Sequence, residues 1–83
     1  MKIKILFFAS LKEALQKDFI YLDLVPPLTG RELKSLLIKE FPEIEKKIDL
    51  CRIACNCEFI EENQELPLQE NLEVALIPPV SGG

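Results

Sequence analysis

The sequence of 83 residues contains no histidine and no tryptophan, and only three of its residues are glycine. The absence of histidine excludes a Ser-His-Asp triad, a histidine general base and any histidine-ligated metal site. Acidic residues outnumber basic ones, which gives a formal net charge of −4 at pH 7. A chain this acidic is a poor candidate for binding nucleic acid or an anionic membrane surface. No apolar run approaches the about 20 residues that a membrane-spanning helix needs.

The composition indicates one small folded domain. Apolar residues make up 48% of the chain and charged residues 29%, which is typical of globular proteins and too apolar for a disordered chain. The start of the chain, Met1–Ala9, loosely resembles a signal peptide, but Lys4 interrupts its apolar run and a buried strand explains it better. We therefore expect a cytoplasmic protein.

The cysteines, Cys51, Cys55 and Cys57, are odd in number, which argues against a disulfide framework. Their spacing is not that of a zinc site, and there is no histidine to complete one. Cys55 and Cys57 share an alternating face with Ile53 and Phe59, where cysteine behaves as a small buried hydrophobe. We predict a packing role for these cysteines and no metal site.

Hydrophobic patterning predicts four strands. Alternating or two-sided apolar segments occur at residues 2–9, 19–25, 52–60 and 72–77. Between the third and fourth of these segments, residues 61–70 are mostly polar and are expected to form a loop. In the first segment, Phe8 faces away from Ile5 and Phe7 because successive side chains of a strand point to opposite faces.

Two capping boxes mark the starts of helices. Ser10-x-x-Glu13 predicts a short helix over residues 10–16, and the stronger box, Thr29-x-x-Glu32, begins a main helix that ends near residue 41, before a proline. One further helical turn is expected within residues 43–50. The main helix carries one apolar stripe for the core: Leu33, Leu36, Leu37 and Phe41.

The order strand, strand, main helix, strand, strand predicts an α+β fold. One mixed sheet of four to five strands would cover the apolar stripe of the helix. The first and last strands should be neighbours in the middle of this sheet, because both carry apolar residues on two faces.

The C-terminal end is the most informative feature. Gly82 and Gly83 follow a buried strand that Pro78-Pro79 ends and stiffens. We expect residues 1–79 to form the domain and residues 80–83 a flexible tail that reaches at most about 14 Å. Such a tail, with little side chain at its end, suits a narrow active-site channel of another protein.

Little chemistry is possible at such an end without activation. Adenylation of the terminal carboxylate would make Gly83 an acyl-adenylate, which a sulfur nucleophile could convert to a thiocarboxylate. Neither step needs an acid or a base from this chain, which agrees with its lack of histidine.

The residues 77–83, IPPVSGG, resemble the Pro-Pro-Val-(Ser/Thr)-Gly-Gly ending of molybdopterin synthase small subunits, the MoaD-type sulfur carriers. The opening residues 5–9, the segment 54–56 and the turn 67–74 resemble the same family, although only the ending is specific. The sequence departs from the family pattern at Glu70-Asn71, where a glycine is common, and around Gln16, where another glycine is expected. Asparagine tolerates the left-handed conformation of such a turn.

The resemblance implies the ubiquitin-like β-grasp fold and a carrier subunit without an active site of its own. In this family the terminal glycine, here Gly83, is adenylated by an E1-like adenylyltransferase that uses ATP, and a sulfur donor protein then converts it to a thiocarboxylate. The carrier inserts its tail into the large synthase subunit and gives sulfur to cyclic pyranopterin monophosphate for molybdenum cofactor biosynthesis. No cofactor is expected to be bound, and the resemblance implies a heterotetramer.

The resemblance also implies which residues contact the large subunit and the other partner proteins. Phe8, Phe59 and Ile77 are expected to contact the large subunit, although alternation places Phe59 in the core. The tail and its approach complete the set of predicted site residues: Pro78, Pro79, Val80, Ser81, Gly82 and Gly83.

Three other functions remain open at this point. A thiamine-pathway sulfur carrier or a ubiquitin-like modifier would use the same Gly-Gly end. A binding module with an incidental Gly-Gly would need no terminal chemistry, and removal of Gly82 and Gly83 would leave its function unchanged.

Overall fold

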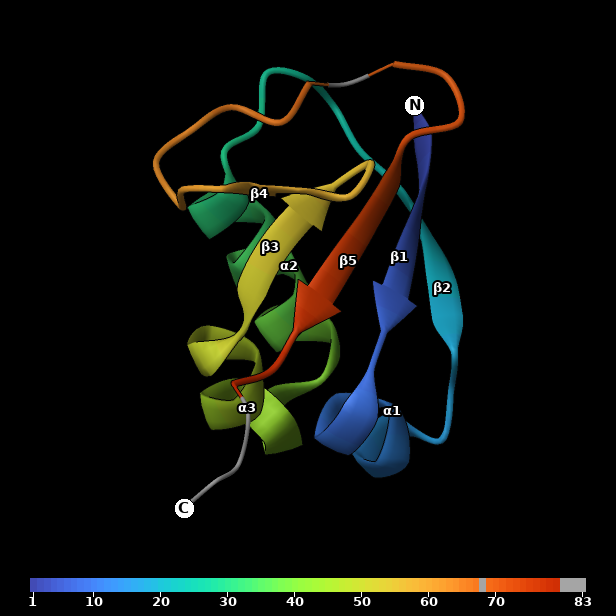
Figure 1. Cartoon of the computed structure of the whole chain (residues 1–83), viewed down its shortest axis with the longest axis vertical. Coiled ribbons are helices and arrows are strands. Elements are labelled where there is room, and N and C mark those ends of the chain that lie inside the picture. The colour runs from blue at the N-terminus through green and yellow to red at the C-terminus, as the bar shows by residue number, and fades with distance from the viewer. Residues whose placement is uncertain (68, 80–83) are drawn as a thin grey trace.

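The computed structural model describes residues 1–67 and 69–79 of the chain (Figure 1). The tail predicted at 80–83 therefore lies outside the described residues. The elements follow in this order: β1 (Lys2–Phe7), α1 (Ala9–Leu15), β2 (Phe19–Asp23), α2 (Gly30–Glu40), the 3-10 turn η1 (Pro42–Ile44), α3 (Glu45–Leu50), β3 (Arg52–Cys55), β4 (Glu58–Ile60) and β5 (Glu73–Ile77). In the described ranges, no helix has the length and apolar character to cross a membrane.

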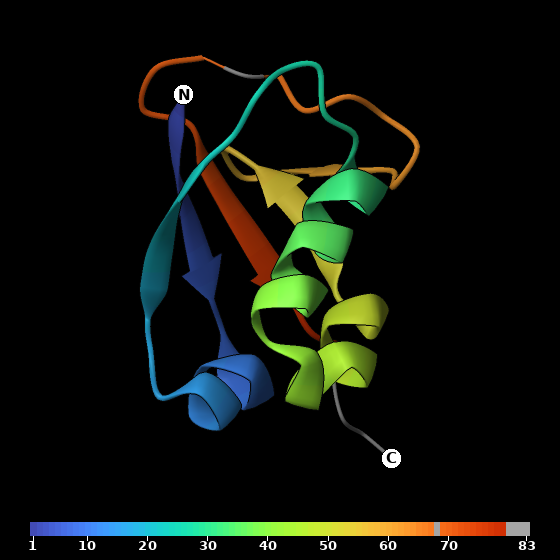
Figure 2. The same cartoon turned by 180° about the vertical axis from the view of Figure 1, so that it is seen from behind.

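The five strands form one mixed sheet in the order β2-β1-β5-β3-β4. β1 and β5 are parallel neighbours, whereas β2 pairs antiparallel with β1 and β3 pairs antiparallel with both β5 and β4. Helix α2 lies across one face of this sheet, as Figure 2 shows from behind. The predicted α+β architecture, a mixed sheet around one main helix with the first and last strands adjacent, is confirmed, and it is the β-grasp arrangement.

Helix α2 begins where the sequence predicts. The backbone N–H of Glu32 donates to Thr29 Oγ1 at 3.2 Å, and the N–H of Thr29 donates to Glu32 Oε1 at 2.8 Å, which completes the capping box. Gly30 lets the helix start close to the sheet, because a Cβ there would lie 2.9 Å from Cδ1 of Ile53.

The capping box predicted at Ser10 is wrong. The chain turns at Ala9, whose φ is 50°, and the helix already begins at this residue, with Phe8 as a cap that offers no side-chain hydrogen bond. Ser10 therefore lies inside the first turn, where its hydroxyl cannot cap the helix. At the other end, Gln16 adopts a φ of 55°, the left-handed conformation for which the family pattern uses glycine. Asn71 has a φ of 64°, which confirms the left-handed turn expected before β5.

The face that α2 buries differs from the predicted stripe. Leu33 and Leu37 are fully buried, but Leu36 is 43% exposed and Lys34 is completely buried in its place. Successive helix residues are turned by about 100°, so a face centred on Leu37 includes Lys34 and leaves Leu36 at its margin. Assigning Leu36 to the core is wrong, because apolar spacing alone does not fix the rotation of a helix on its sheet.

Lys34 is tolerated in the interior because its ammonium group is fully engaged. Its Nζ donates to the carbonyl oxygen of Asp49 at 2.8 Å and to Glu62 Oε2 at 2.6 Å. Arg31 joins the same network through ion pairs with Asp49 and Glu62. A buried charge is strongly unfavourable without such partners, so the network fixes α2 to α3 and to the loop after β4.

The segment predicted as one strand at 52–60 is two strands. Asn56 and Cys57 have φ values of 49° and 71°, and they form the two-residue turn of a tight hairpin between β3 and β4. Turns with positive φ at both central residues match the twist of paired strands. Because the turn breaks the alternation, Cys57 and Phe59 are exposed, and the prediction that they belong to the buried face is wrong.

The burial of Leu37 predicts a large cost of truncation. Leu37→Ala should reduce the free energy of unfolding by about 2–5 kcal/mol, because it removes a fully buried side chain and leaves a cavity. Leu36→Ala is the matched control on the same helix and should change stability by less than about 1 kcal/mol. Urea denaturation followed by circular dichroism measures both, and equal losses in the two variants would refute the assigned rotation of α2.

The Lys34 network predicts a dependence of stability on pH. The hydrogen bond from Lys34, together with the charges of Lys34 and Arg31, holds the pKa of Glu62 below its ordinary value. The folded pKa is thus lower than the unfolded value of about 4.3, and the stabilisation is complete above that value and is lost as pH falls through the folded pKa. Glu62→Gln should therefore be less stable than wild type near neutral pH, and the difference should shrink in acid.

Urea denaturation at neutral and at acidic pH tests this expectation. Glu43→Gln serves as the control, because Glu43 is exposed and takes part in none of the ion pairs among the described residues. It should match wild type at both pH values. If the difference in unfolding free energy between Glu62→Gln and wild type is the same at both pH values, the lowered pKa of Glu62 is contradicted.

Candidate functional site

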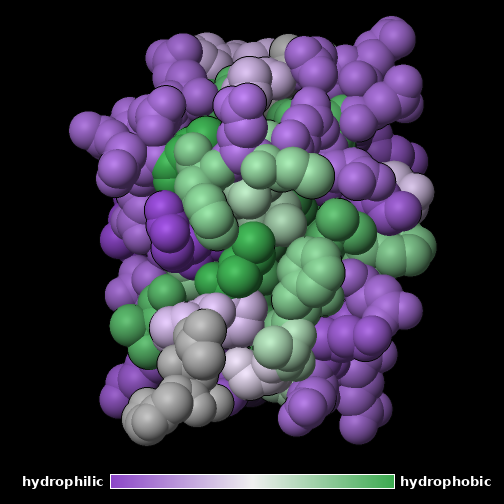
Figure 3. Space-filling view, in the orientation of Figure 1, coloured by the Kyte–Doolittle hydropathy of each residue, from purple (hydrophilic) through white to green (hydrophobic). Residues whose placement is uncertain are grey.

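The sheet face opposite α2 is not covered by any described element, and it carries an apolar band. In Figure 3 this band crosses the face between surrounding hydrophilic side chains. At its centre lies a shallow pocket with contributions from β1, β3, β4 and β5, lined by Leu6, Phe8, Ala54, Asn56, Cys57, Phe59, Glu73, Ala75 and Ile77. An exposed apolar surface of this kind is a candidate site for contact with another macromolecule.

Strand register explains why these side chains meet. Ala54 lies opposite Ala75 on one side and opposite Phe59 on the other. The two alanines leave space at the centre of the face, and the larger side chains of Phe59, Phe8 and Ile77 surround it. The structure thus brings the three predicted contact residues together in one pocket.

The exposure of the aromatic residues sets this surface apart from the core. Phe8 is 45% exposed and Phe59 is 51% exposed, whereas Phe7, the neighbour of Phe8 in sequence, is 3% exposed. Phe8 extends the backbone of β1, with φ −129° and ψ 156°, so it continues the outward side of the alternation. The outward direction expected for Phe8 is confirmed, and Phe59 is exposed although alternation placed it in the core.

The chain leaves the sheet beside this pocket. Ile77 is the last residue of β5, Pro78 is half-buried and Pro79 is exposed. The strand ends at the same end of the molecule as β1 (Figure 1). Val80, Ser81, Gly82 and Gly83, predicted as the reactive tail, lie outside the described residues.

Two cationic side chains of the outer face make cation–π contacts with aromatic rings. The sequence analysis predicted neither contact. The guanidinium carbon of Arg52 lies 3.8 Å from the centre of the Phe59 ring. Lys4 Nζ lies 4.4 Å from the centre of the Phe19 ring, which in turn makes an edge contact with Tyr21 at 5.5 Å. Only the register of the strands brings these residues together, so no local motif could have revealed the pairs.

The cysteines divide into two groups. Cys51 and Cys55 are buried, and burial raises the pKa of both thiols, which keeps them protonated and unreactive. Their predicted packing role is confirmed, whereas Cys57 is an exposed thiol of the outer pocket. Within residues 1–67 and 69–79, no cluster of three or more cysteine or acidic side chains is arranged to hold a metal ion.

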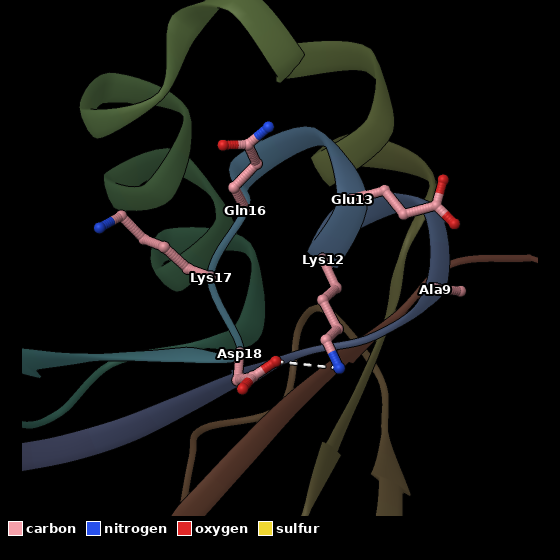
Figure 4. A pocket seen from close by; sticks show the side chains of 6 residues that line it. All are labelled: Ala9, Lys12, Glu13, Gln16, Lys17 and Asp18. Carbon is pink, nitrogen blue, oxygen red and sulfur yellow. Dashed lines mark ion pairs between the residues drawn. The ribbon is translucent and has the colours of Figure 1, made fainter.

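A second depression lies beside α1, and its side chains do not converge (Figure 4). Lys12 and Asp18 point toward one another and form an ion pair of 2.9 Å, while Glu13, Gln16 and Lys17 point in other directions. Groups that bind a ligand or act on a substrate must face a common point. The outer sheet face is therefore the better candidate for a functional site.

The shape of the domain has many counterparts among solved structures. SAMP1 from Haloferax volcanii matches with a TM-score of 0.81 at 23% identity, over 100% of both chains. A complex of subunits 1 and 2 of the molybdopterin-converting factor from Helicobacter pylori contains a chain that matches with a TM-score of 0.70 at 24% identity, over 100% of both chains. The ubiquitin of Caldiarchaeum subterraneum matches with a TM-score of 0.68 at 18% identity, over 100% of this chain and 98% of that chain. These likenesses confirm the ubiquitin-like β-grasp fold.

Similarity in sequence is more specific. The molybdopterin synthase sulfur carrier subunit of Dictyostelium discoideum is 39% identical over 83 residues, which cover 99% of this chain and 96% of that protein. The model of the ThiS family matches residues 5–83, which include the residues of the outer pocket and the Gly-Gly end. The chain therefore belongs to the ThiS family.

Proposed function

We propose that this chain is the sulfur-carrier subunit of a molybdopterin synthase. The observation that carries the proposal is the 39% identity to a protein of that name over almost the full length of both chains. The ending Pro-Pro-Val-Ser-Gly-Gly supports it, because it supplies a terminal carboxylate without a bulky side chain nearby.

The reaction takes place at Gly83 and needs groups that other proteins provide. An E1-like adenylyltransferase joins the Gly83 carboxylate to AMP from ATP, and pyrophosphate leaves. A sulfur nucleophile at the oxidation level of sulfide, supplied through a donor protein, then attacks the acyl carbon of Gly83; AMP leaves, and a thiocarboxylate remains on Gly83. ATP is a substrate of the activating enzyme, and this chain binds no cofactor of its own.

The charged carrier then delivers its sulfur to cyclic pyranopterin monophosphate in the large synthase subunit. The outer pocket around Phe8, Phe59 and Ile77 docks on that subunit, and Pro78 and Pro79 direct Val80–Gly83 into its active site. The Helicobacter pylori structure, a complex of two molybdopterin-converting factor subunits, supports such a partner. The proposal includes a heterotetrameric assembly and a cytoplasmic location, in which the free thiols of the chain remain reduced.

Intact-mass spectrometry tests the terminal chemistry. Incubation of the purified chain with the activating enzyme, ATP and the sulfur donor should give a species in which one oxygen atom is replaced by sulfur. Gly82→Val should lower its yield by about tenfold or more without changing the melting temperature, because a β-branched side chain restricts the backbone beside the reactive end.

Two results would contradict the proposal. One is a terminal carboxylate that stays unchanged under all these conditions. The other is recovery of the chain linked to lysine side chains of target proteins, which would indicate a ubiquitin-like modifier. Rescue of thiamine auxotrophy alone would favour the thiamine pathway.

The docking surface generates a separate prediction. Phe59→Ser should weaken binding to the large subunit by about 30-fold. This corresponds to a loss of about 2 kcal/mol in binding free energy, which is typical of a residue that contributes strongly to an interface. Stability should change little, because the ring is half exposed in the free chain. Val25→Ser is the matched control, because Val25 is an exposed apolar residue of the loop after β2. Calorimetric titration measures both, and equal affinities for Phe59→Ser and wild type would refute this assignment of the docking surface.

A further inference from the structure

Arg52 stands out among the charged residues of the outer face. It is the first residue of β3, it lies opposite Ile77 in the pairing of β3 with β5, and it is exposed. Its guanidinium is held over the Phe59 ring at 3.8 Å. A cation is thus fixed at the edge of the apolar pocket, beside the strand that leads into the tail.

The charge of Arg52 is not neutralised within the described residues. The ion pairs found there involve Arg31, Lys34, Lys12 and the N-terminal amine, and Arg52 takes part in none of them. Its contact with Phe59 leaves the N–H donors of the guanidinium available, and these donors match the two oxygens of a carboxylate.

Lys4, the other cation over an aromatic ring, is in a different situation. It lies opposite Glu73 in the pairing of β1 with β5, so an acidic residue shares its part of the face. On the β5 side, the residue opposite Arg52 is the apolar Ile77. Arg52 is therefore a cation at the edge of the pocket that forms no ion pair with another described residue.

An apolar contact alone does not orient a carrier. Burial of hydrophobic surface is non-directional, so the pocket around Phe59 supplies affinity but tolerates rotation about the contact. A bidentate ion pair at the edge of the pocket has a defined direction. Because Arg52 lies next to the end of β5, an ion pair there would fix the direction in which the tail leaves.

We propose that Arg52 binds a carboxylate on the large synthase subunit and so sets the orientation of the carrier for insertion of its tail. This inference rests on the proposed function, and it adds the chemistry of the partner surface: apolar at the centre, with an acidic side chain at the edge that faces the start of β3. Arg52 acts as a positioning residue and does not touch the reacting atoms.

Binding to the purified large subunit at low and high salt tests the inference. Arg52→Gln should weaken binding by about tenfold at about 0.05 M salt, and the difference from wild type should fall to about twofold or less at about 0.5 M, because salt screens an ion pair at a rim. Arg52→Lys keeps the charge but loses the bidentate geometry, and its affinity should lie between the two.

The rate of sulfur transfer at saturating large subunit gives a second readout. If Arg52 orients the carrier, Arg52→Gln should also transfer sulfur more slowly once bound. Lys39→Gln is the matched control, because Lys39 is an exposed residue of α2 on the other side of the sheet. This variant should match wild type in affinity, salt dependence and rate.

The outcomes separate this inference from the proposed function. If Phe59→Ser abolishes binding but Arg52→Gln binds like wild type at low salt, the docking surface stands and the role of Arg52 is refuted. A loss for Arg52→Gln that is equal at both salt concentrations also refutes it, because lost packing on Phe59 would explain that result. If neither variant affects binding, the docking surface itself is wrong.

Discussion

The parallel pairing of the first and last strands determines the rest of this structure. Register joins Ile5 to Val74 and Phe7 to Leu76 at the centre of the sheet, and all four side chains are buried. Parallel neighbours cannot be joined by a tight turn, so the helices and the remaining strands lie between them in sequence. Because β5 runs in the same direction as β1, both strands end at the same end of the sheet (Figure 1).

The two faces of the sheet serve different purposes. The inner face buries its side chains against Leu33 and Leu37 of α2, and the Lys34 network fixes that helix in place. The outer face combines small alanines with exposed aromatic rings, which leaves an apolar depression in the free chain. One face supplies stability and the other is available for a partner.

This division of roles fits the proposed carrier function. A carrier needs a reactive end, a surface that a second protein recognises, and a fixed relation between the two. Strand β5 contributes Ala75 and Ile77 to the pocket, and Pro78 and Pro79 follow this strand directly in sequence. Membership of the ThiS family and the ubiquitin-like fold agree with such a role.

The sequence by itself determined the main helix with its Thr29 cap, the central position of the first and last strands, and the Gly-Gly end, because each depends on local patterns. Tertiary structure alone decided the rotation of α2, which buries Lys34 in place of Leu36, and the hairpin at Asn56–Cys57, which turns Phe59 outward. It also decided the pairing of Arg52 with Phe59. These features depend on which strands become neighbours and in what register, and such non-local contacts leave no periodic trace in the sequence.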